Sequence, residues 1–251
     1  ARDMKYKYGA KDPRSLTLRF HTQTAGCSLT AQQPEINIVR VAIQAMAGVL
    51  GGTQSLHTDS MDEALALPSE KAVQIALRTQ QIIAHESGVA NVADPLGGSY
   101  YLEWLTDDME RQAREYFDRI ESLGGVVSAI EKGFFQKEIA AAAYKYQQEI
   151  DNDERVVVGV NEFTSDEPVE IPILEMDPDG FERQCQRLKS LRSSRNKSRH
   201  SASLAAIEKA AEGDQNLMPH FIEAAKAKAT LGEMCDVLRG VFGEYREGSD
   251  F

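Results

Sequence analysis

Cysteine is scarce in this chain, and the spacings by which cysteine and histidine usually bind zinc are missing. The three cysteines among its 251 residues, Cys27, Cys185 and Cys235, lie far apart. Without a Cys-x-x-Cys pair, the sequence predicts neither a zinc site nor a framework of disulfides. Isolated cysteines are typical of a reducing compartment, so we expect a cytoplasmic protein without a metal site.

Long apolar runs and an excess of positive charge are also missing. No apolar stretch approaches the roughly 20 residues of a membrane-spanning helix, and residues 1–5 lack the apolar core of a signal peptide. The 39 acidic residues outnumber the 28 basic ones, for a formal net charge of −11. This charge disfavours binding to the phosphate backbone of a nucleic acid. We therefore expect neither a membrane nor a nucleic acid as a partner.

The first hundred residues alternate between strand-like and helix-like segments. The predicted strands are residues 15–24, 53–58 and 92–101, and the predicted helices are residues 34–50, 61–67 and 70–87. Alternation of this kind is typical of a parallel sheet or a barrel. The first part of the chain is therefore expected to belong to the α/β class.

From Thr106 onward the sequence is mostly helical. Thr106 is a suitable N-cap for a helix that ends at Gly124-Gly125, and a second helix is predicted over 135–150. A β-branched run predicts one strand over 155–160, followed by an acidic, proline-containing connector over 161–179. Three further helices are predicted, and the last begins with Thr230-Leu231-Gly232-Glu233, a capping-box pattern.

The first predicted strand is polar on one face only, because side chains alternate across a strand. The apolar face carries Leu16, Leu18 and Phe20, and the polar face carries Ser15, Thr17, Arg19, His21 and Gln23. If helices cover the apolar face, the polar face lines the inside of a barrel, where Val, Ile and Leu are usual. The alternative is an amphipathic strand with its polar face in water, and the pattern leaves both open.

The second predicted strand, residues 53–58, is also polar, which favours a lined cavity. In a barrel, chemistry gathers at the C-terminal strand ends. Those ends are His21–Gln23 in the first strand and Leu56–Asp59 in the second. We also expect Gln54 to share the inner face with His21 and Gln23.

Four blocks of sequence in this region carry a resemblance to a known family. They are Arg19–Gly26, Gly51–Thr58, Asp62–Leu65 and Asp94–Tyr100. In order and spacing they closely resemble catalytic chains of the methylmalonyl-CoA mutase family. The similarity continues through Val158–Asn161 to about Tyr245 and so covers nearly the whole chain.

The resemblance implies the C-terminal part of a (β/α)₈ TIM barrel, followed by a mostly helical region. Residues 1–123 would hold the last strands and helices of an incomplete barrel, and residues 124–251 the helical region. The first barrel strands and the family's Asp-x-His-x-x-Gly cobalamin-binding module do not occur in this sequence. We therefore expect a chain or segment that completes the barrel and a cobalamin-binding subunit as partners.

The resemblance also implies an isomerase that uses adenosylcobalamin to rearrange the carbon skeleton of an acyl-CoA, with coenzyme A along the barrel axis. Conversion of methylmalonyl-CoA to succinyl-CoA is the first candidate. The alternatives are a mutase for isobutyryl-CoA or another branched acyl-CoA, and a non-catalytic fragment that docks on a cobalamin-binding subunit. We expect no mutase activity without the missing barrel half and the cobalamin-binding domain.

The resemblance assigns roles to particular residues. It implies catalytic roles for His21 and Gln23; cofactor contacts for Gln23, Asp59, Glu63 and Ala64; and contacts with the CoA substrate for Arg19, Gln54 and His57. Asp59 departs from the family, which usually has Asn there. A second carboxylate near Glu63 would repel it, so Asp59→Asn is expected to be neutral or to improve cofactor binding.

Each of these residues also has a purely structural interpretation. Ser60 and Glu63 fit a capping box for the predicted helix over 61–67. His21 and His57 could be satisfied interior histidines, and the two glutamines could bond neighbouring strands. Residues 183–199 hold seven Lys or Arg and no acidic residue, which we interpret as a solvated helix face or a subunit contact.

Overall fold

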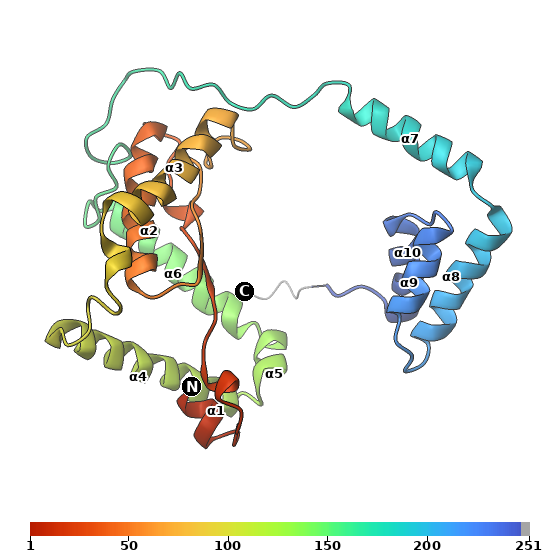
Figure 1. The fold of residues 1–251 in the computed structure, drawn as a ribbon, viewed down its shortest axis with the longest axis horizontal. Helices are drawn as coiled ribbons and strands as arrows, with labels where there is room; N and C mark the ends of the chain where they lie inside the picture. Colours follow the sequence, from red (N-terminus) through yellow and green to blue (C-terminus); the bar gives the residue numbers. More distant parts are fainter. Residues whose placement is uncertain (247–251) are drawn as a thin grey trace. The chain divides into compact units, whose positions relative to one another are not determined.

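The computed structural model describes residues 1–246 and shows a mostly helical α/β chain with a small parallel sheet (Figure 1). The chain divides into two compact units, Ala1–Leu174 and Glu175–Phe251. The boundary between these units differs from the one after residue 123 that the family resemblance implies. The boundary after residue 123 concerns the end of the barrel, and it stays a prediction. No helix within residues 1–246 is long and apolar enough to cross a membrane. The three cysteines are free thiols.

The first unit contains two short strands among six α-helices. The strands are β1 (His21–Gln23) and β2 (Ser55–His57), and the helices are α1 (Arg2–Tyr6), α2 (Asn37–Leu50), α3 (Glu70–Glu86), α4 (Tyr100–Ser122), α5 (Val126–Glu131) and α6 (Phe134–Asp151). Single 3₁₀ turns occupy Pro13–Leu16, Gly26–Ser28, Pro34–Ile36 and Val89–Asn91. The predictions of α2, α3, α6 and the second strand are thereby confirmed in type and approximate position.

Helix α2 connects β1 to β2, and the two strands pair in parallel. The register aligns His21 with Ser55, Thr22 with Leu56 and Gln23 with His57. A Cβ atom at Gly48 of α2 would lie 3.1 Å from Thr22 Cγ2 and 3.7 Å from a Leu56 methyl group. The helix therefore covers the face made by Thr22 and Leu56. His21 and Gln23 point to the opposite face, as their positions in the strand predict.

The first strand is much shorter than predicted. Asp12 accepts a hydrogen bond from Arg14 N at 2.9 Å and Pro13 stands at the first position of a 3₁₀ turn, so residues 13–16 leave the extended conformation. Leu18 is 76% exposed. The predicted continuous apolar face from Leu16 to Phe20 is therefore wrong, and only residues 21–23 form the strand.

Three other predicted elements are absent from residues 1–246. Residues 92–99 form turns around Gly97 and Gly98, and α4 begins at Tyr100 instead of after Thr106, whose hydroxyl donates to Leu102 O. Residues 61–67 form turns and not a helix. Residues 155–160 form a loop closed by Asn161, whose side chain binds Val157 N and Arg155 O. In each case local turn chemistry prevails over strand or helix propensity.

The second unit has four helices in its described part, one more than predicted. They are α7 (Gly180–Ser194), α8 (Lys197–Ala211), α9 (Met218–Lys226) and α10 (Leu231–Phe242). Helix α8 packs against both α9 and α10, and its small core includes Ile207, Ala210 and Ala224, each at most 1% exposed. The predicted capping box at Thr230 and Glu233 is confirmed.

Glu233 is also the centre of an ion-pair network that ties the start of α8 to the start of α10. Arg195 donates two hydrogen bonds to its carboxylate, each 2.7 Å long, and His200 Nε2 lies 3.3 Å from Oε2. The Arg195 hydrogen bonds, followed by those from Thr230 and His200, hold the pKa of Glu233 far below its usual value. Paired, multiply bonded carboxylates of this kind stabilise the folded state above their unfolded pKa.

We predict that Glu233→Gln lowers the stability of the second unit by roughly 2–3 kcal/mol at pH 7, because charge-assisted hydrogen bonds are lost. The lowered pKa makes the stabilisation complete above the ordinary value of 4.5 and progressively lost below it. The difference between wild type and variant should therefore shrink as the pH falls below this value. Hydrogen–deuterium exchange of peptides from α8 and α10 measures this difference in stability.

Glu223→Gln provides the matched control in the same unit. Glu223 pairs with Lys226 and Arg199 but its side chain is 59% exposed, so its ion pairs contribute about 0–1 kcal/mol. Equal protection losses in the two variants would contradict the role of the Glu233 network.

Candidate functional site

The candidate site lies at the C-terminal ends of β1 and β2 and in the loops that follow them. Parallel pairing places these two ends at the same edge of the sheet. The predicted residues on these ends and loops are Gln23, His57, Asp59, Glu63 and Ala64, and His21 is the first residue of β1, on the same face as Gln23. The structure therefore gathers most of the predicted site residues in one place.

Asp59 is buried at the centre of this place, with a residue exposure of 2%. Its Oδ1 accepts a hydrogen bond from Gln23 Nε2 at 3.0 Å, and its Oδ2 accepts one from Thr24 Oγ1 at 2.9 Å. The Thr24 hydroxyl in turn accepts from Asp59 N at 2.9 Å. Thr24 and Asp59 thus form a closed ring of hydrogen bonds between the two strand ends.

Two histidines flank this ring on the face away from α2. His57 Nε2 lies 3.7 Å from Asp59 Oδ1, and the imidazole is 57% exposed. His21 Nδ1 lies 2.7 Å from Ser55 Oγ, which links the paired positions of β1 and β2. Both rings belong to exposed residues within residues 1–246, and whether they are satisfied interior histidines of a completed barrel stays a prediction.

Gln54 and Arg19 lie at the opposite, N-terminal ends of the strands. The Gln54 side chain accepts from Phe20 N at 2.8 Å and donates to Gly52 O at 2.8 Å. The register places Gln54 opposite Phe20 and not on the face of His21 and Gln23, so that expectation is wrong. Thr17 also leaves the predicted polar face, because its hydroxyl binds Arg14 O in the 3₁₀ turn. Arg19 is exposed.

Glu63 offers a free carboxylate beside the buried one. A Cβ atom at Gly26 would lie 3.5 Å from Glu63 Oε1 and 3.7 Å from Asp59 Oδ2. Glu63 is exposed, and its carboxylate makes no hydrogen bond or ion pair within residues 1–246. The expected capping box with Ser60 is absent because no helix begins there. Glu63 is therefore available to a ligand, and its exposed neighbour Ala64 adds no polar group.

Asn37, which the sequence analysis missed, holds the two loops of the site together. It is fully buried, accepts from Thr30 N, and donates to Thr30 O and to Met61 O. Thr30 belongs to the loop after β1, and Met61 to the loop after β2. Nothing in the pattern singled out Asn37, because an Asn at a helix start is common and its partners are distant in sequence.

The loop after β2 is also fixed at its two ends. Thr58 donates to Ala76 O of α3 at 2.8 Å, and buried Asp62 accepts from Ser69 N, at the N-cap of α3, through Oδ2. Glu63 follows Asp62 directly, so the same turn holds the backbone of Glu63. No group of three or more potential metal ligands occurs within residues 1–246.

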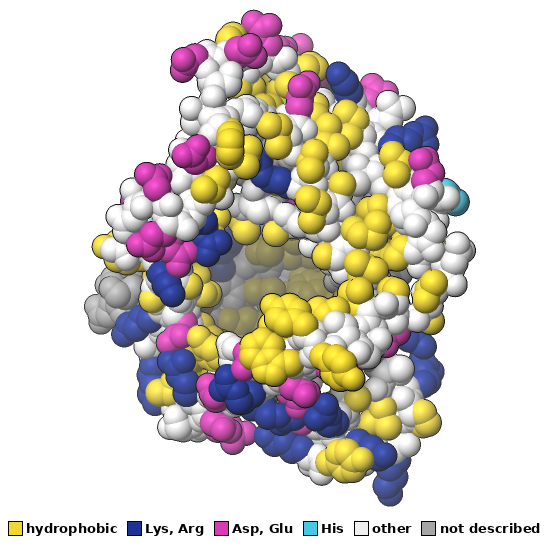
Figure 2. Space-filling view, turned by 90° about the vertical axis from the view of Figure 1, so that its left-hand side faces the viewer, with side chains coloured by type: hydrophobic (Ala, Val, Ile, Leu, Met, Phe, Trp, Pro, Cys, Tyr) yellow, Lys and Arg dark blue, Asp and Glu magenta, His cyan; other side chains and the backbone are white. Residues whose placement is uncertain are grey.

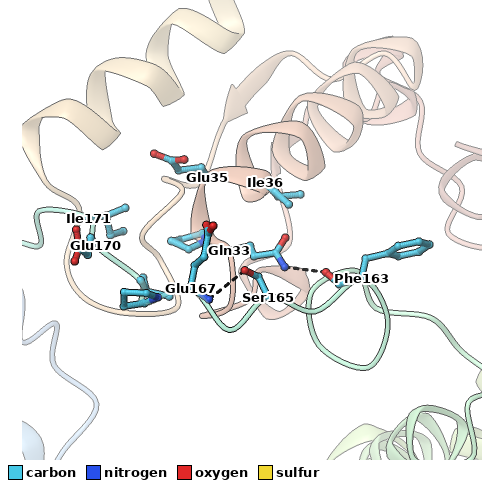
Figure 3. Close-up of a pocket in the computed structure, with 11 residues that line it drawn as sticks. Gln33, Glu35, Ile36, Phe163, Ser165, Glu167, Glu170 and Ile171 are labelled. Carbon is cyan, nitrogen blue, oxygen red and sulfur yellow. Dashed lines mark hydrogen bonds between the residues drawn. The ribbon is translucent and has the colours of Figure 1, made fainter.

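A separate pocket of about 520 Å³ lies between the start of α2 and the connector (Figure 3). Its lining includes Gln33, Glu35 and Ile36 on one side and Phe163, Glu167 and Ile171 on the other. Gln33 donates to Phe163 O at 2.9 Å, and Glu167 N donates to Ser165 Oγ at 3.2 Å (Figure 3). The pocket contains none of the predicted site residues.

Comparison with known proteins places the sequence in a family. Residues 1–244 match the family described as methylmalonyl-CoA mutase. The chain is 47% identical over 98% of its length to the 2-hydroxyisobutanoyl-CoA mutase large subunit of Aquincola tertiaricarbonis, of which it covers 44%. It is 45% identical over 94% of its length to the mitochondrial methylmalonyl-CoA mutase of Homo sapiens, of which it covers 32%.

The Escherichia coli methylmalonyl-CoA mutase is similar to the same degree, at 44% identity over 95% of the chain and 34% of that protein. The chain thus spans less than half the length of these relatives. A match over nearly all of its own residues shows that the chain belongs to the methylmalonyl-CoA mutase family.

Proposed function

We propose that this chain is the C-terminal part of the large, catalytic subunit of an adenosylcobalamin-dependent acyl-CoA mutase, an isomerase. The observation that carries the proposal is the strand–helix–strand unit β1–α2–β2. It brings His21, Gln23 and His57 to one face of a parallel sheet, with Gln23 and His57 at its C-terminal edge beside Asp59 and Glu63. Family membership supports this assignment.

We propose that β1, α2, β2 and α3 are consecutive parts of a (β/α)₈ barrel. Within residues 1–246 the sheet has two strands, so each strand has an unpaired edge. Hydrophobic side chains remain exposed on α2 and α3, including Val39, Ile43 and Leu77, and Figure 2 shows many such side chains on one face of the molecule. Further strands and helices would cover such edges and faces. A partner chain or segment that completes the barrel would supply them.

The proposed substrate is a branched acyl-CoA, with methylmalonyl-CoA as the first candidate. The exposed face of His21, Ser55 and His57 would line the path of coenzyme A. Arg19, with its exposed guanidinium, is suited to an anionic part of the substrate. Gln54 uses both ends of its amide inside the chain, which makes it a weaker candidate than Arg19 or His57.

The residues present fit a ribose hydroxyl pair of the cofactor. Glu63 has an exposed carboxylate without a partner inside the described chain, and a carboxylate can accept two charge-assisted hydrogen bonds. Gly26 lies beside it, where an added Cβ would lie 3.4 Å from Glu63 Cγ, an ordinary van der Waals contact. Adenosylcobalamin, when bound, supplies the radical chemistry, and the chain's own residues bind, orient and exclude water. A cobalamin-binding subunit would hold the rest of the cofactor.

We predict that Glu63→Ala weakens adenosylcobalamin binding by the assembled enzyme roughly ten- to a hundredfold, since one or two charge-assisted hydrogen bonds are lost. The free energy of unfolding should change by less than about 0.5 kcal/mol, because Glu63 makes no internal hydrogen bond. Equilibrium dialysis and urea unfolding give the two values. Glu70→Ala, at another exposed residue, is the control. A loss of stability with unchanged affinity would instead assign Glu63 a structural role.

We also predict that the 251-residue chain alone does not convert methylmalonyl-CoA to succinyl-CoA. An open sheet exposes the reacting groups to water, whereas radical chemistry requires a closed site. Mass spectrometry of CoA products would compare the chain alone with a mixture that adds the missing barrel half and a cobalamin-binding subunit from a relative. Turnover by the chain alone would contradict the proposed incomplete barrel, and absence of turnover in both samples would favour a non-catalytic docking role.

A further inference from the structure

The hydrogen bond between Asp59 and Gln23 determines which end of the Gln23 amide faces outward. An ionised carboxylate only accepts hydrogen bonds, so the group 3.0 Å from Asp59 Oδ1 must be the Nε2 amide of Gln23. The Oε1 atom then points to the other side. Within residues 1–246 this oxygen has no hydrogen-bond partner, so Gln23 presents a free acceptor to the site.

Asp59 is itself held firmly enough to impose this orientation. Its side chain is 1% exposed, and its second oxygen accepts from Thr24, whose hydroxyl accepts from Asp59 N. Rotation of the carboxylate would break both bonds in a buried place, which is costly. The orientation of Gln23 therefore follows from a rigid group and not from its own rotamer preference.

We infer that Asp59 is a positioning residue that makes Gln23 accept a hydrogen bond from a hydroxyl group of the bound ligand. The inference rests on the proposed function and narrows its ligand chemistry. The hydroxyl belongs either to the acyl group of a hydroxyacyl-CoA or to the ribose of the cofactor. A carboxylate of the ligand at the same place would bring its own acceptor oxygens against Gln23 Oε1, and the two groups would repel each other.

The usual family residue at this position, Asn, lacks this effect. An Asn amide both donates and accepts, so it can pair with either end of the Gln23 amide. Asp59→Asn therefore frees Gln23 to turn its NH₂ group outward and also removes one acceptor used by Gln23 or Thr24. The expectation that this substitution is neutral or beneficial, which considered only repulsion from Glu63, is replaced by a predicted loss.

The first test is a substrate comparison with the assembled enzyme: this chain, the barrel-completing half and a cobalamin-binding subunit. We expect Asp59→Asn to lower kcat/KM for 2-hydroxyisobutyryl-CoA relative to methylmalonyl-CoA by about tenfold, the effect of one hydrogen bond. If the hydroxyl is instead the ribose's, KM for adenosylcobalamin rises about tenfold with both substrates. Glu70→Gln, at an exposed residue outside the site loops, is the control.

A double-mutant cycle separates positioning from a general loss of structure. Gln23→Met should reproduce the Asp59→Asn effect, and the double variant should add less than about twofold, because both changes remove the same contact. Additive effects would overturn the inference. Should Asp59→Asn fail to fold, Gln23→Met alone must still change the substrate ratio or the cofactor KM.

The second test does not require turnover. In the ¹⁵N-glutamine-labelled chain, the Gln23 side-chain NH₂ signals, identified by their loss in Gln23→Met, should lie downfield in wild type and move upfield in Asp59→Asn. Unchanged signals would overturn the positioning role. If the signals move but no acyl-CoA is turned over, the Asp59–Gln23 contact is supported and the proposed function is rejected.

Discussion

The site depends on the hydrogen bonds of a single buried amide, that of Asn37. Its two ends bind Thr30 in the loop after β1 and Met61 in the loop after β2. A sheet of two strands, each only three residues long, cannot fix such loops by itself. Arg40, which donates to Asn37 Oδ1 at 2.7 Å and to Val158 O at 2.7 Å, extends the same network to a distant loop.

Burial separates the two carboxylates of the site into different tasks. Asp59 is surrounded by donors from its own chain, and so it organises Gln23 and Thr24. Glu63 stands four residues later at the surface with its oxygens unused. The same carboxylate group therefore holds the structure together at Asp59 and is available to a ligand at Glu63. A carboxylate only accepts hydrogen bonds, so it binds whichever donors surround it.

Sequence predicted those parts whose cause is local. Helices α2, α3 and α6 and the capping box at Thr230 follow from periodicity, glycine stops and caps within a few residues. The face shared by His21 and Gln23 follows from strand alternation. Gln54 was misplaced because its side depends on the register with β1, and Asn37 was missed because its partner Met61 lies 24 residues away. The strand predicted over 92–101 does not form, because turns around Gly97 and Gly98 occupy this stretch.

Gln33 donates a hydrogen bond to Phe163 O, and Arg40 donates one to Val158 O. Within the described chain, Phe163 is the last residue that such a bond ties to the region around α2. Within the described chain, no hydrogen bond or ion pair joins residues 164–176 to β1, β2 or the loops that carry Asp59 and Glu63. The polypeptide could therefore be cut or rejoined in this stretch without breaking a bond of the site. Changes of length or sequence in this stretch would leave the hydrogen bonds around Asp59 and Asn37 as they are.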